Sequence, residues 1–293
     1  MKEIVVYFTH LGFIGFGGPM ALIAQMQREL VEKRKWIESD DFRQTLGLIK
    51  SMPGSIATQT AIFLGHRRQG FWGGLVAGAS LNLPSFFFIL ILAKFYNQFV
   101  KIPWIQSVLT GMQLSACALI LLAANYLAAP YKKSIYFWIF GILSFIFLHW
   151  LDFSEALTIV GTGLISIFAK RLKPSIFLFI VSPSLFNVFS GELSNNADQS
   201  KSILVNLFLI CLKAGTFVFG SGLAIVPFLE NDIVSRLNWM THAQFMDALA
   251  FGQLTPGPVL LSVCFIGFKV AGWTGAVLAT FAVYFSSFFH MLN

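Results

Sequence analysis

Two Pro-Gly dipeptides are the part of this sequence best suited to bind an anion. Pro53-Gly54 is followed by Ser55, and Pro256-Gly257 is followed by Pro258. Proline is favoured in the first turn of a helix, where free N–H groups and the positive end of the helix dipole attract anions. We therefore expect half-helices that begin at Ser55 and Pro258 and direct partial positive charge towards a bound anion.

The composition places these half-helices in a membrane. Of 293 residues, 56% are hydrophobic and only 11% are charged, and the mean hydropathy is +0.74. A soluble domain carries about 25% charged residues, so this chain lacks the polar surface of a water-soluble globule. Apolar runs such as 71–93 and 102–126 reach the ~20 residues that a spanning helix needs. The net charge of +7 comes from short loops between apolar runs, which favours membrane topology over nucleic-acid binding as its cause.

Glycine-rich stretches provide two further points at which a helix can break. Non-helical backbone is stable at membrane depth only where protein or water satisfies its polar groups, so such breaks favour a binding site. The alternative is that glycine and proline are simply common in membrane helices. The predicted substrate-binding set combines all four breaks with nearby polar residues: Gly17, Gly18, Pro19, Lys50, Pro53, Gly54, Ser55, Thr58, Gln59, Lys213, Gly220, Gly222, Gln253, Thr255, Pro256, Gly257 and Pro258.

Basic residues within apolar runs support an anionic substrate. Lys213 lies in the run 207–226, and Lys50 lies three residues before the first Pro-Gly. Ionisable groups inside a membrane are costly and usually functional, although a lysine can also extend its ammonium to the membrane surface. Thr58 and Gln59 follow the first Pro-Gly by one helical turn, where their polar groups either line a pore or bond a neighbouring helix.

Three ionisable residues are candidates to carry a coupling proton: His10, Glu230 and Asp247. Asp247 precedes the second Pro-Gly, and Glu230 lies in the loop before it. For both carboxylates the alternative is a solvated loop charge or a helix cap. His10 occupies the place in the first half of the chain that Lys213 occupies in the second.

The second half of the chain repeats the first at a spacing of about 200 residues. Matches at a shift of 203 include Phe16-Gly17-Gly18-Pro19 with Phe219-Gly220-Ser221-Gly222, Trp36 with Trp239, and Pro53-Gly54 with Pro256-Gly257. After a slip of one residue, Gly65, Gly70, Gly73 and Ser85 match Gly267, Gly272, Gly275 and Ser287. We therefore divide the chain into a first repeat at 1–93, connecting transmembrane helices at 94–200, and a second repeat at 201–293 that lacks the expected C-terminal helices.

The loops of the two copies differ in charge. Around 27–43 and 66–68 the first copy has seven Lys/Arg, whereas the matching places of the second copy have two, Arg236 and Lys269. Excess Lys/Arg marks cytoplasmic loops, so we expect copies of opposite orientation, as in many secondary transporters. The predicted fold class is all-α, a polytopic membrane protein with two inverted-topology repeats that contain broken or re-entrant helices. Crossings are expected near 71–93, 103–127, 134–150, 156–169, 174–190 and 271–289.

Sequence motifs of enzymes and of cofactor binding are absent. The chain has no Walker loop, dinucleotide-binding glycine pattern, His-Glu-x-x-His or Cys-x-x-Cys. We therefore expect no catalytic residues, no cofactor and no metal site. Without an ATP site, transport has to run downhill or be coupled to an ion gradient.

Four stretches resemble the chromate transporter family of prokaryotic inner membranes: FGGPMALIAQMQRELVEKRKWI, PGSIATQTAIFLGHRRQGFWGGLVAG, KAGTFVFGSGLAIVPFLENDIV and FGQLTPGPVLL. The resemblance implies a multi-pass secondary transporter in the lipid bilayer of the inner membrane. It implies export of the oxyanion chromate, with sulfate exchanged or also carried, and thereby chromate resistance. It also implies two related halves of opposite orientation.

A second hypothesis is a truncated or non-transporting membrane paralogue that packs with a complete partner. The sequence ends soon after Ser286-Ser287, and Lys50 and Ser55 stand where family members usually have Gln and Pro. A homodimer or a partner chain would then supply the missing helices. The retained Pro-Gly pairs and Lys213 favour transport over this alternative.

Overall fold

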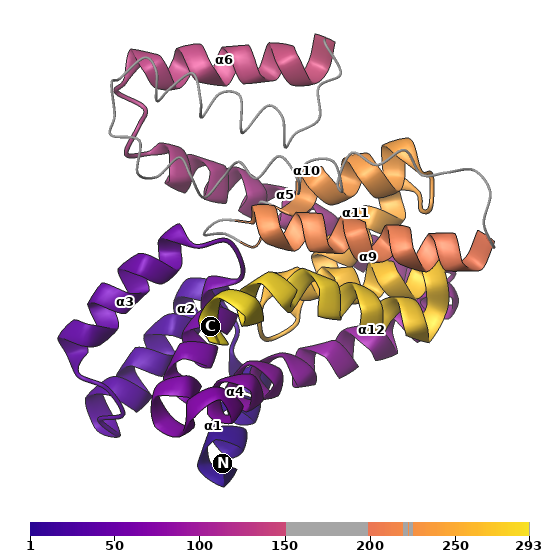
Figure 1. Ribbon diagram of the computed structural model, residues 1–293. Coiled ribbons are helices and arrows are strands. Elements are labelled where there is room, and N and C mark those ends of the chain that lie inside the picture. Colours follow the sequence, from indigo (N-terminus) through magenta and orange to yellow (C-terminus); the bar gives the residue numbers. More distant parts are fainter. Residues whose placement is uncertain (151–198, 219–221, 223–224, 293) are drawn as a thin grey trace. The chain divides into compact units, whose positions relative to one another are not determined.

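A computed structural model describes residues 1–150, 199–218, 222 and 225–292, in which every regular element is a helix (Figure 1). Three of these helices are long and apolar enough to cross a membrane, at Ile56–Phe99, Pro103–Leu122 and Val259–Leu292. The prediction of an all-α polytopic membrane protein is therefore confirmed. The crossings expected near 156–169 and 174–190 lie outside the described residues.

Residues 1–120 and 198–293 form one compact unit, which contains both copies of the repeat, and residues 121–197 form another. In the second unit, the end of α5 (Pro103–Ala128) is followed by α6 (Ile135–Trp150). The elements of the first copy are α1 (Lys2–Ile14), α2 (Gly18–Met26), the π-helix η1 (Gln27–Lys33), α3 (Ser39–Ser51) and α4 (Ile56–Phe99). Those of the second copy are α9 (Gln199–Phe217), α10 (Ile225–Leu229), the π-helix η4 (Glu230–Arg236), α11 (His242–Leu254), the 3-10 turn η5 (Val259–Leu261) and α12 (Ser262–Leu292).

The helix α4 is a hairpin of two limbs, 56–68 and 71–99. It reverses direction at Gly70, whose φ of +65° is readily adopted only by glycine. Across the hairpin, a Cβ on Gly65 would collide with the carbonyl oxygen of Gly73, and Thr58 Oγ1 lies 3.3 Å from Asn82 Oδ1. Such contacts require antiparallel limbs, because a single helix would hold these residues far apart.

The helix α12 repeats this hairpin. It turns at Gly272, with φ of +62°, and a Cβ on Gly267 would collide with the carbonyl oxygen of Gly275. Small residues let the two limbs approach closely, which is a common way for helices to pack in membranes. The glycines that match in sequence therefore perform the same packing task in both copies.

Ion pairs hold three helix ends of the first copy together on one side. Arg68 pairs with Glu3 at 3.6 Å, and Arg67 pairs with Asp41 at 3.5 Å. These residues lie at the hairpin tip of α4 and near the N-termini of α1 and α3. Because α3 starts at this side and the first limb of α4 returns to it, the two helices and the turn Met52–Ser55 form a re-entrant hairpin.

α1 and α2 form a similar hairpin around the first glycine-rich break. Arg34 pairs with Glu3 at 3.2 Å, and Tyr7 donates a hydrogen bond to the carbonyl oxygen of Gln25 at 3.3 Å. The chain therefore enters along α1, turns at 15–18, and returns along α2 and η1.

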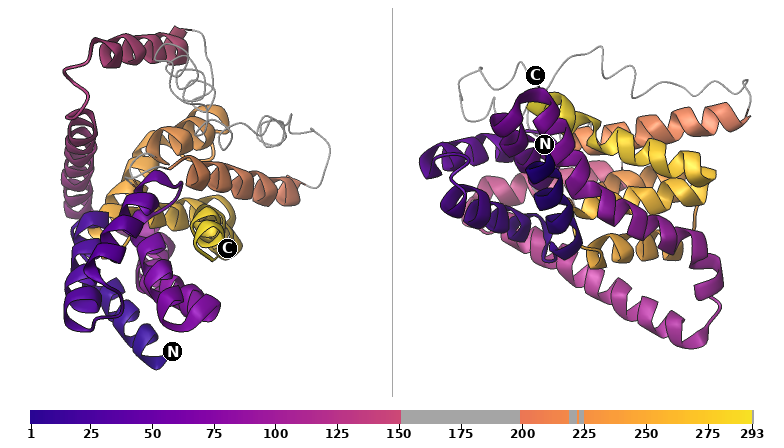
Figure 2. Two further views of the ribbon diagram at one scale, coloured as in Figure 1. Left: turned by 60° about the vertical axis from the view of Figure 1, so that its left-hand side comes forward. Right: turned by 90° about the horizontal axis from the view of Figure 1, so that it is seen from below.

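The long limbs of α4 and α12, which correspond to each other in the repeat, pack side by side. In Figure 1, α12 lies alongside α9 on one side and α4 on the other, and Figure 2 again shows α4 beside α12. A Cβ on Gly78 would touch Phe288, whereas the Lys94 ammonium lies 5.8 Å from the Trp273 ring centroid near the other end of the limb. The long limbs of α4 and α12 are therefore antiparallel, which is the arrangement that inverted copies require.

Candidate functional site

Each Pro-Gly turn is bonded to the other copy of the repeat. The amide of Gly54 donates a hydrogen bond to the carbonyl oxygen of Val218 at 2.7 Å, and the amide of Gly257 donates to that of Gly15 at 2.9 Å. Gly15 and Val218 are 203 residues apart, as are the two Pro-Gly glycines, so the bonds are equivalent under the repeat. Each bond joins the second break of one copy to the first break of the other.

A serine from the long limb of each hairpin completes these contacts. Ser287 Oγ accepts a hydrogen bond from the amide of Ser55 at 3.0 Å, and Ser85 Oγ donates to the carbonyl oxygen of Pro256. Ser85 lies at the middle of the limb 71–99, which places the second Pro-Gly turn beside the middle of a helix long enough to span a membrane. The two serines match in the repeat, but serine alone is too common in membrane helices to indicate this role.

The turns are closed in this conformation. We expected free first-turn N–H groups at Ser55, but the second copy already supplies acceptors to the amides of Gly54 and Ser55. The start of α4 is as predicted, with Ser55 as its N-cap. In the second copy, Pro258 precedes the 3-10 turn η5 rather than an α-helix. An anion that reached the first turn would have to replace Val218 and Ser287 as acceptors.

A buried polar cluster follows the first turn. Thr58 Oγ1 lies 3.2 Å from Ser55 Oγ and 3.3 Å from Asn82 Oδ1, and all three residues are buried. Tyr284, which occupies the position of Asn82 in the second copy, lies beside Thr58. Thr58 therefore bonds the other limb of α4 in this structure, and the cluster also provides hydroxyl groups at the turn.

Several buried polar atoms near the turns have no hydrogen-bond partner among the described residues: Gln59 Oε1, both amide atoms of Gln253 and Ser262 Oγ. Leaving such an atom unsatisfied costs about 1–3 kcal/mol, so buried groups of this kind usually bind water or a ligand.

Lys213 has a buried counter-charge that the sequence analysis did not identify. Its ammonium lies 3.0 Å from Oδ2 of Asp232, and the two side chains are 13% and 4% exposed. The other carboxylate oxygen lies 3.1 Å from the Arg236 guanidinium. Lys213 is therefore not a free cation in this conformation. The cost of burying an isolated charge predicts an acidic partner, but the partner lies in a separate helix, η4, and cannot be chosen from spacing.

The two candidate coupling carboxylates occupy different environments. Asp247 is buried inside α11, where it accepts hydrogen bonds from the Tyr96 hydroxyl at 2.6 Å and from Gln113 Nε2 at 2.8 Å. The alternative of a solvated loop charge or a helix cap is therefore wrong for Asp247. Glu230 is a half-exposed residue of η4, where it meets His242 Nδ1 at 3.6 Å.

The remaining predicted residues are distributed between the interior and the surface. Thr255 is buried and donates to the carbonyl oxygen of Gly252 at 3.3 Å, and Gly222 packs against Leu260. Three of them are exposed on the compact unit: His10, Gly17 and Lys50. Gly18 and Pro19 are half-buried. The carbonyl oxygen of Pro53 accepts a hydrogen bond from Gln59 Nε2 at 2.6 Å. Gly220 lies outside the described residues.

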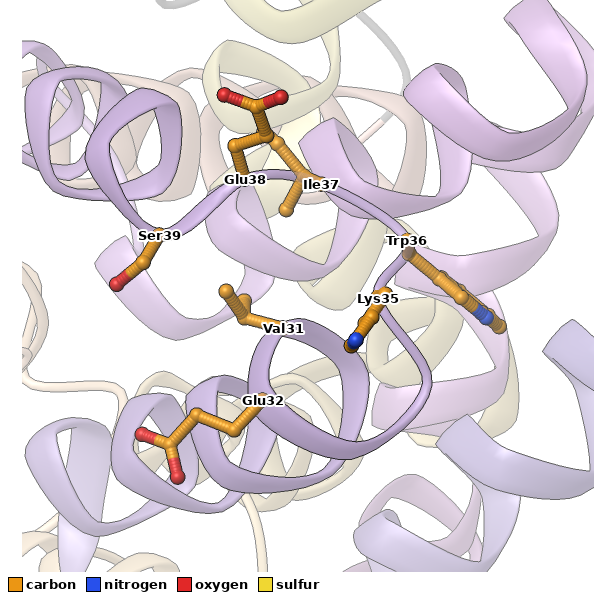
Figure 3. A pocket seen from close by; sticks show the side chains of 7 residues that line it. All are labelled: Val31, Glu32, Lys35, Trp36, Ile37, Glu38 and Ser39. Atoms are coloured by element: carbon orange, nitrogen blue, oxygen red, sulfur yellow. The ribbon is translucent and has the colours of Figure 1, made fainter.

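A surface pocket of about 420 Å³ lies away from the turns, where η1 leads into α3 (Figure 3). Its lining residues are Val31, Glu32, Lys35, Trp36, Ile37, Glu38 and Ser39. Glu32 and Glu38 lie on opposite sides of this pocket, and Lys35 is its single cation. This excess of negative charge disfavours an anion there, so the buried turns remain the better candidate site.

Broken helices whose turns bond to the other copy of an internal repeat are a common feature of secondary membrane transporters. The chain belongs to the chromate transporter family, whose sequence profile matches residues 2–167 and 205–293. This membership indicates a multi-pass membrane transporter rather than an enzyme.

Curated relatives share most of the chain. A "Chromate transport protein" of Cupriavidus metallidurans is 35% identical over 97% of this chain and 71% of the relative. A "Probable chromate transport protein" of Synechococcus elongatus is 32% identical over 97% of this chain and 73% of the relative. A "Chromate transport protein" of Pseudomonas aeruginosa is 28% identical over 98% of this chain and 70% of the relative. No solved structure matches the chain.

The cross-copy contact at Gly54 predicts a stability difference between two glycines. Gly54 and Gly18 have φ of +125° and +77°, so alanine would strain both backbones by about 1–3 kcal/mol. At Gly54 the new methyl group would lie 2.5 Å from Ser287 Oγ of the other copy and 2.7 Å from Gln59 Nε2, whereas nothing lies within 4 Å at Gly18. Gly54→Ala should therefore cost about 1–3 kcal/mol more than Gly18→Ala in thermal unfolding of the detergent-purified protein.

A second-site variant tests the cause of that difference. Ser287→Ala removes the oxygen that the new methyl group would meet, so it should recover part of the stability lost in Gly54→Ala. Equal melting temperatures for Gly54→Ala and Gly18→Ala would show that the contact between the copies is not tight.

Proposed function

We propose that the protein carries tetrahedral oxyanions across the cell inner membrane, exporting chromate and also carrying or exchanging sulfate. The observation that supports this most strongly is that each Pro-Gly turn bonds to the first break of the other copy. Gly54 bonds to Val218, and Gly257 bonds to Gly15. The names of the relatives supply chromate as the substrate of first choice.

In the proposed cycle, the two copies move relative to one another about these turns. Releasing the bond between Gly54 and Val218 while keeping that between Gly257 and Gly15 would open the interface between the two copies towards one side of the membrane. Releasing the other bond would open it towards the opposite side. Two equivalent bonds in copies of opposite direction thus provide the two gates that alternating access requires.

The anion would bind to the groups that opening exposes. The amides of Gly54 and Ser55 would lose their acceptors from the second copy, and oxyanion oxygens would replace them. The hydroxyls of Thr58 and Tyr284 lie next to this turn and can donate hydrogen bonds. Backbone amides and hydroxyls recognise a tetrahedral dianion by shape and charge, which chromate and sulfate share, so we expect the two anions to compete.

A second candidate function is that of a subunit that needs a partner. Its support is an asymmetry between α3 and α11: Asp247 of α11 is covered by Tyr96 and Gln113, whereas the matching Gln44 of α3 is exposed. Another chain, or a second copy of this one, would then cover α3.

Flux measurements on the purified chain alone test the proposal. Liposomes that contain only this protein should take up labelled sulfate in a saturable manner, and external chromate should inhibit that uptake while chloride should not. Liposomes without protein provide the background. Flux that requires an added full-length relative would support the subunit function, and the absence of flux in both preparations would contradict oxyanion transport.

Of the two carboxylates among the three coupling candidates, we propose Asp247 as the better one to carry a proton. Its carboxylate faces Tyr96 of α4 and Gln113 of α5, and a cation, Lys269 of α12, packs on the Tyr96 ring with its ammonium 4.9 Å from the ring centroid. A carboxylate held only by neutral donors can accept a proton without breaking an ion pair. Asp247→Asn, which imitates the protonated state, should therefore flatten the pH dependence of sulfate flux.

Glu230→Gln is the matched control for this experiment, because Glu230 is half-exposed and outside the buried network. It should keep the wild-type pH profile. A wild-type profile in the Asp247→Asn variant would show that Asp247 serves only to hold α11 against α4 and α5.

A further inference from the structure

We propose that Asp232 is an internal competitor of the transported oxyanion, occupying a binding site formed by Lys213 and Arg236. During transport the dianion would displace the Asp232 carboxylate from both cations. This inference rests on the proposed function, and it adds a site, a competing group and a reason for selectivity that the Pro-Gly turns do not provide.

The Asp232 carboxylate contacts Lys213 and Arg236 in the way that a bound oxyanion would. Asp232 presents one oxygen to the Lys213 ammonium at 3.0 Å and the other to the Arg236 guanidinium at 3.1 Å. A sulfate or chromate ion presents two oxygens along any edge of its tetrahedron, so it can span the same two donors. Hydrogen bonds from charged donors to such oxygens are among the stronger polar contacts in proteins.

The charges of the site favour a dianion. Lys213 and Arg236 together carry two positive charges, and Asp232 carries one negative charge, which leaves an excess of one positive charge. With Asp232 displaced, a dianion would neutralise both cations, whereas chloride or nitrate would leave one uncompensated. Charges interact strongly where water is excluded, so this difference should discriminate between the two classes of anion.

The side chains differ in exposure in a way that provides an entrance. Lys213 and Asp232 are 13% and 4% exposed, but Arg236 is 54% exposed. An incoming anion would therefore meet Arg236 first and reach Lys213 by replacing Asp232. Lys213 lies on α9, whose end leads to Val218, the acceptor of the Gly54 amide, so the site adjoins the segment that forms one of the turn contacts.

The first copy carries the equivalent carboxylate without the buried cation. Glu29 matches Asp232 and pairs with Lys33 at 3.0 Å, just as Asp232 pairs with Arg236, but His10 stands in the place of Lys213. The pKa of Glu29 is lowered by hydrogen bonds from Lys33 and Arg34. Since its side chain is also 30% exposed, Glu29 belongs to a solvated ion cluster, and it provides a matched control.

The experiment compares sulfate binding by the detergent-purified wild type, Asp232→Asn and Glu29→Gln. Sulfate is the probe because chromate oxidises thiols and Cys117 is exposed. Removing the competing charge should tighten sulfate binding by about tenfold, measured by titration calorimetry, while Glu29→Gln should bind sulfate as the wild type does. Sulfate bound equally or more weakly by a folded Asp232→Asn variant would overturn the inference.

A double variant covers the case in which Asp232→Asn does not fold. If Asp232 serves only to neutralise Lys213, then adding Lys213→Gln should restore stability and leave sulfate binding and flux at wild-type levels. Wild-type binding by this double variant would also overturn the inference. If the two residues form the site, the double variant should be stable and should lose sulfate binding. Two outcomes separate this inference from the proposed function. If the wild type carries sulfate but Asp232→Asn binds it no more tightly, only this inference is refuted. If the wild type neither binds nor carries sulfate or chromate, the proposed function is refuted as well.

Discussion

The amide groups of Gly54 and Gly257 impose the constraint on which the rest of the structure depends. A broken helix at membrane depth leaves backbone N–H groups that water does not reach, and each needs an acceptor. This fold supplies both acceptors from the opposite copy, through Val218 and Gly15. Neither copy can satisfy its own turn in this way, which makes the interface between the copies a requirement for burying the breaks. In the proposed cycle, the contacts that bury the two breaks are also the contacts that transport has to release.

The two copies share their backbone and differ in their charges. Glycines that turn or pack the hairpins match in position, as Gly70 matches Gly272 and Gly65 matches Gly267. The buried ionisable groups follow no such symmetry, since Asp247 and the pair of Lys213 with Asp232 belong to the second copy alone. In the proposed cycle, a symmetric scaffold would suit two alternative openings, while the asymmetric charges would give the transported ion and any coupled proton a direction.

Much of this backbone was predictable from sequence, and most of the polar network was not. Glycine and proline restrict the backbone locally, so Pro53-Gly54 and its repeat match were visible without a structure, as was the start of α4 at Ser55. The partners of Lys213 and Asp247 depend on helices that meet in space after long intervals of sequence. Asp232 and Tyr96 were therefore missed, and the turns expected to be open to an anion are closed by the other copy.

The opposite orientation of the two copies in the membrane is the central claim, and labelling of two matched positions tests it most directly. Glu32 and Ser235 are exposed, lie 203 residues apart and occupy the same place in η1 and η4. Glu32→Cys and Ser235→Cys, each in a Cys117→Ser background that removes the exposed native thiol, can be treated on intact cells with a membrane-impermeant maleimide. We predict that Ser235→Cys reacts on intact cells and Glu32→Cys reacts only after the membrane is opened. Reaction of both variants from the same side would contradict the inverted arrangement and the transport cycle built on it.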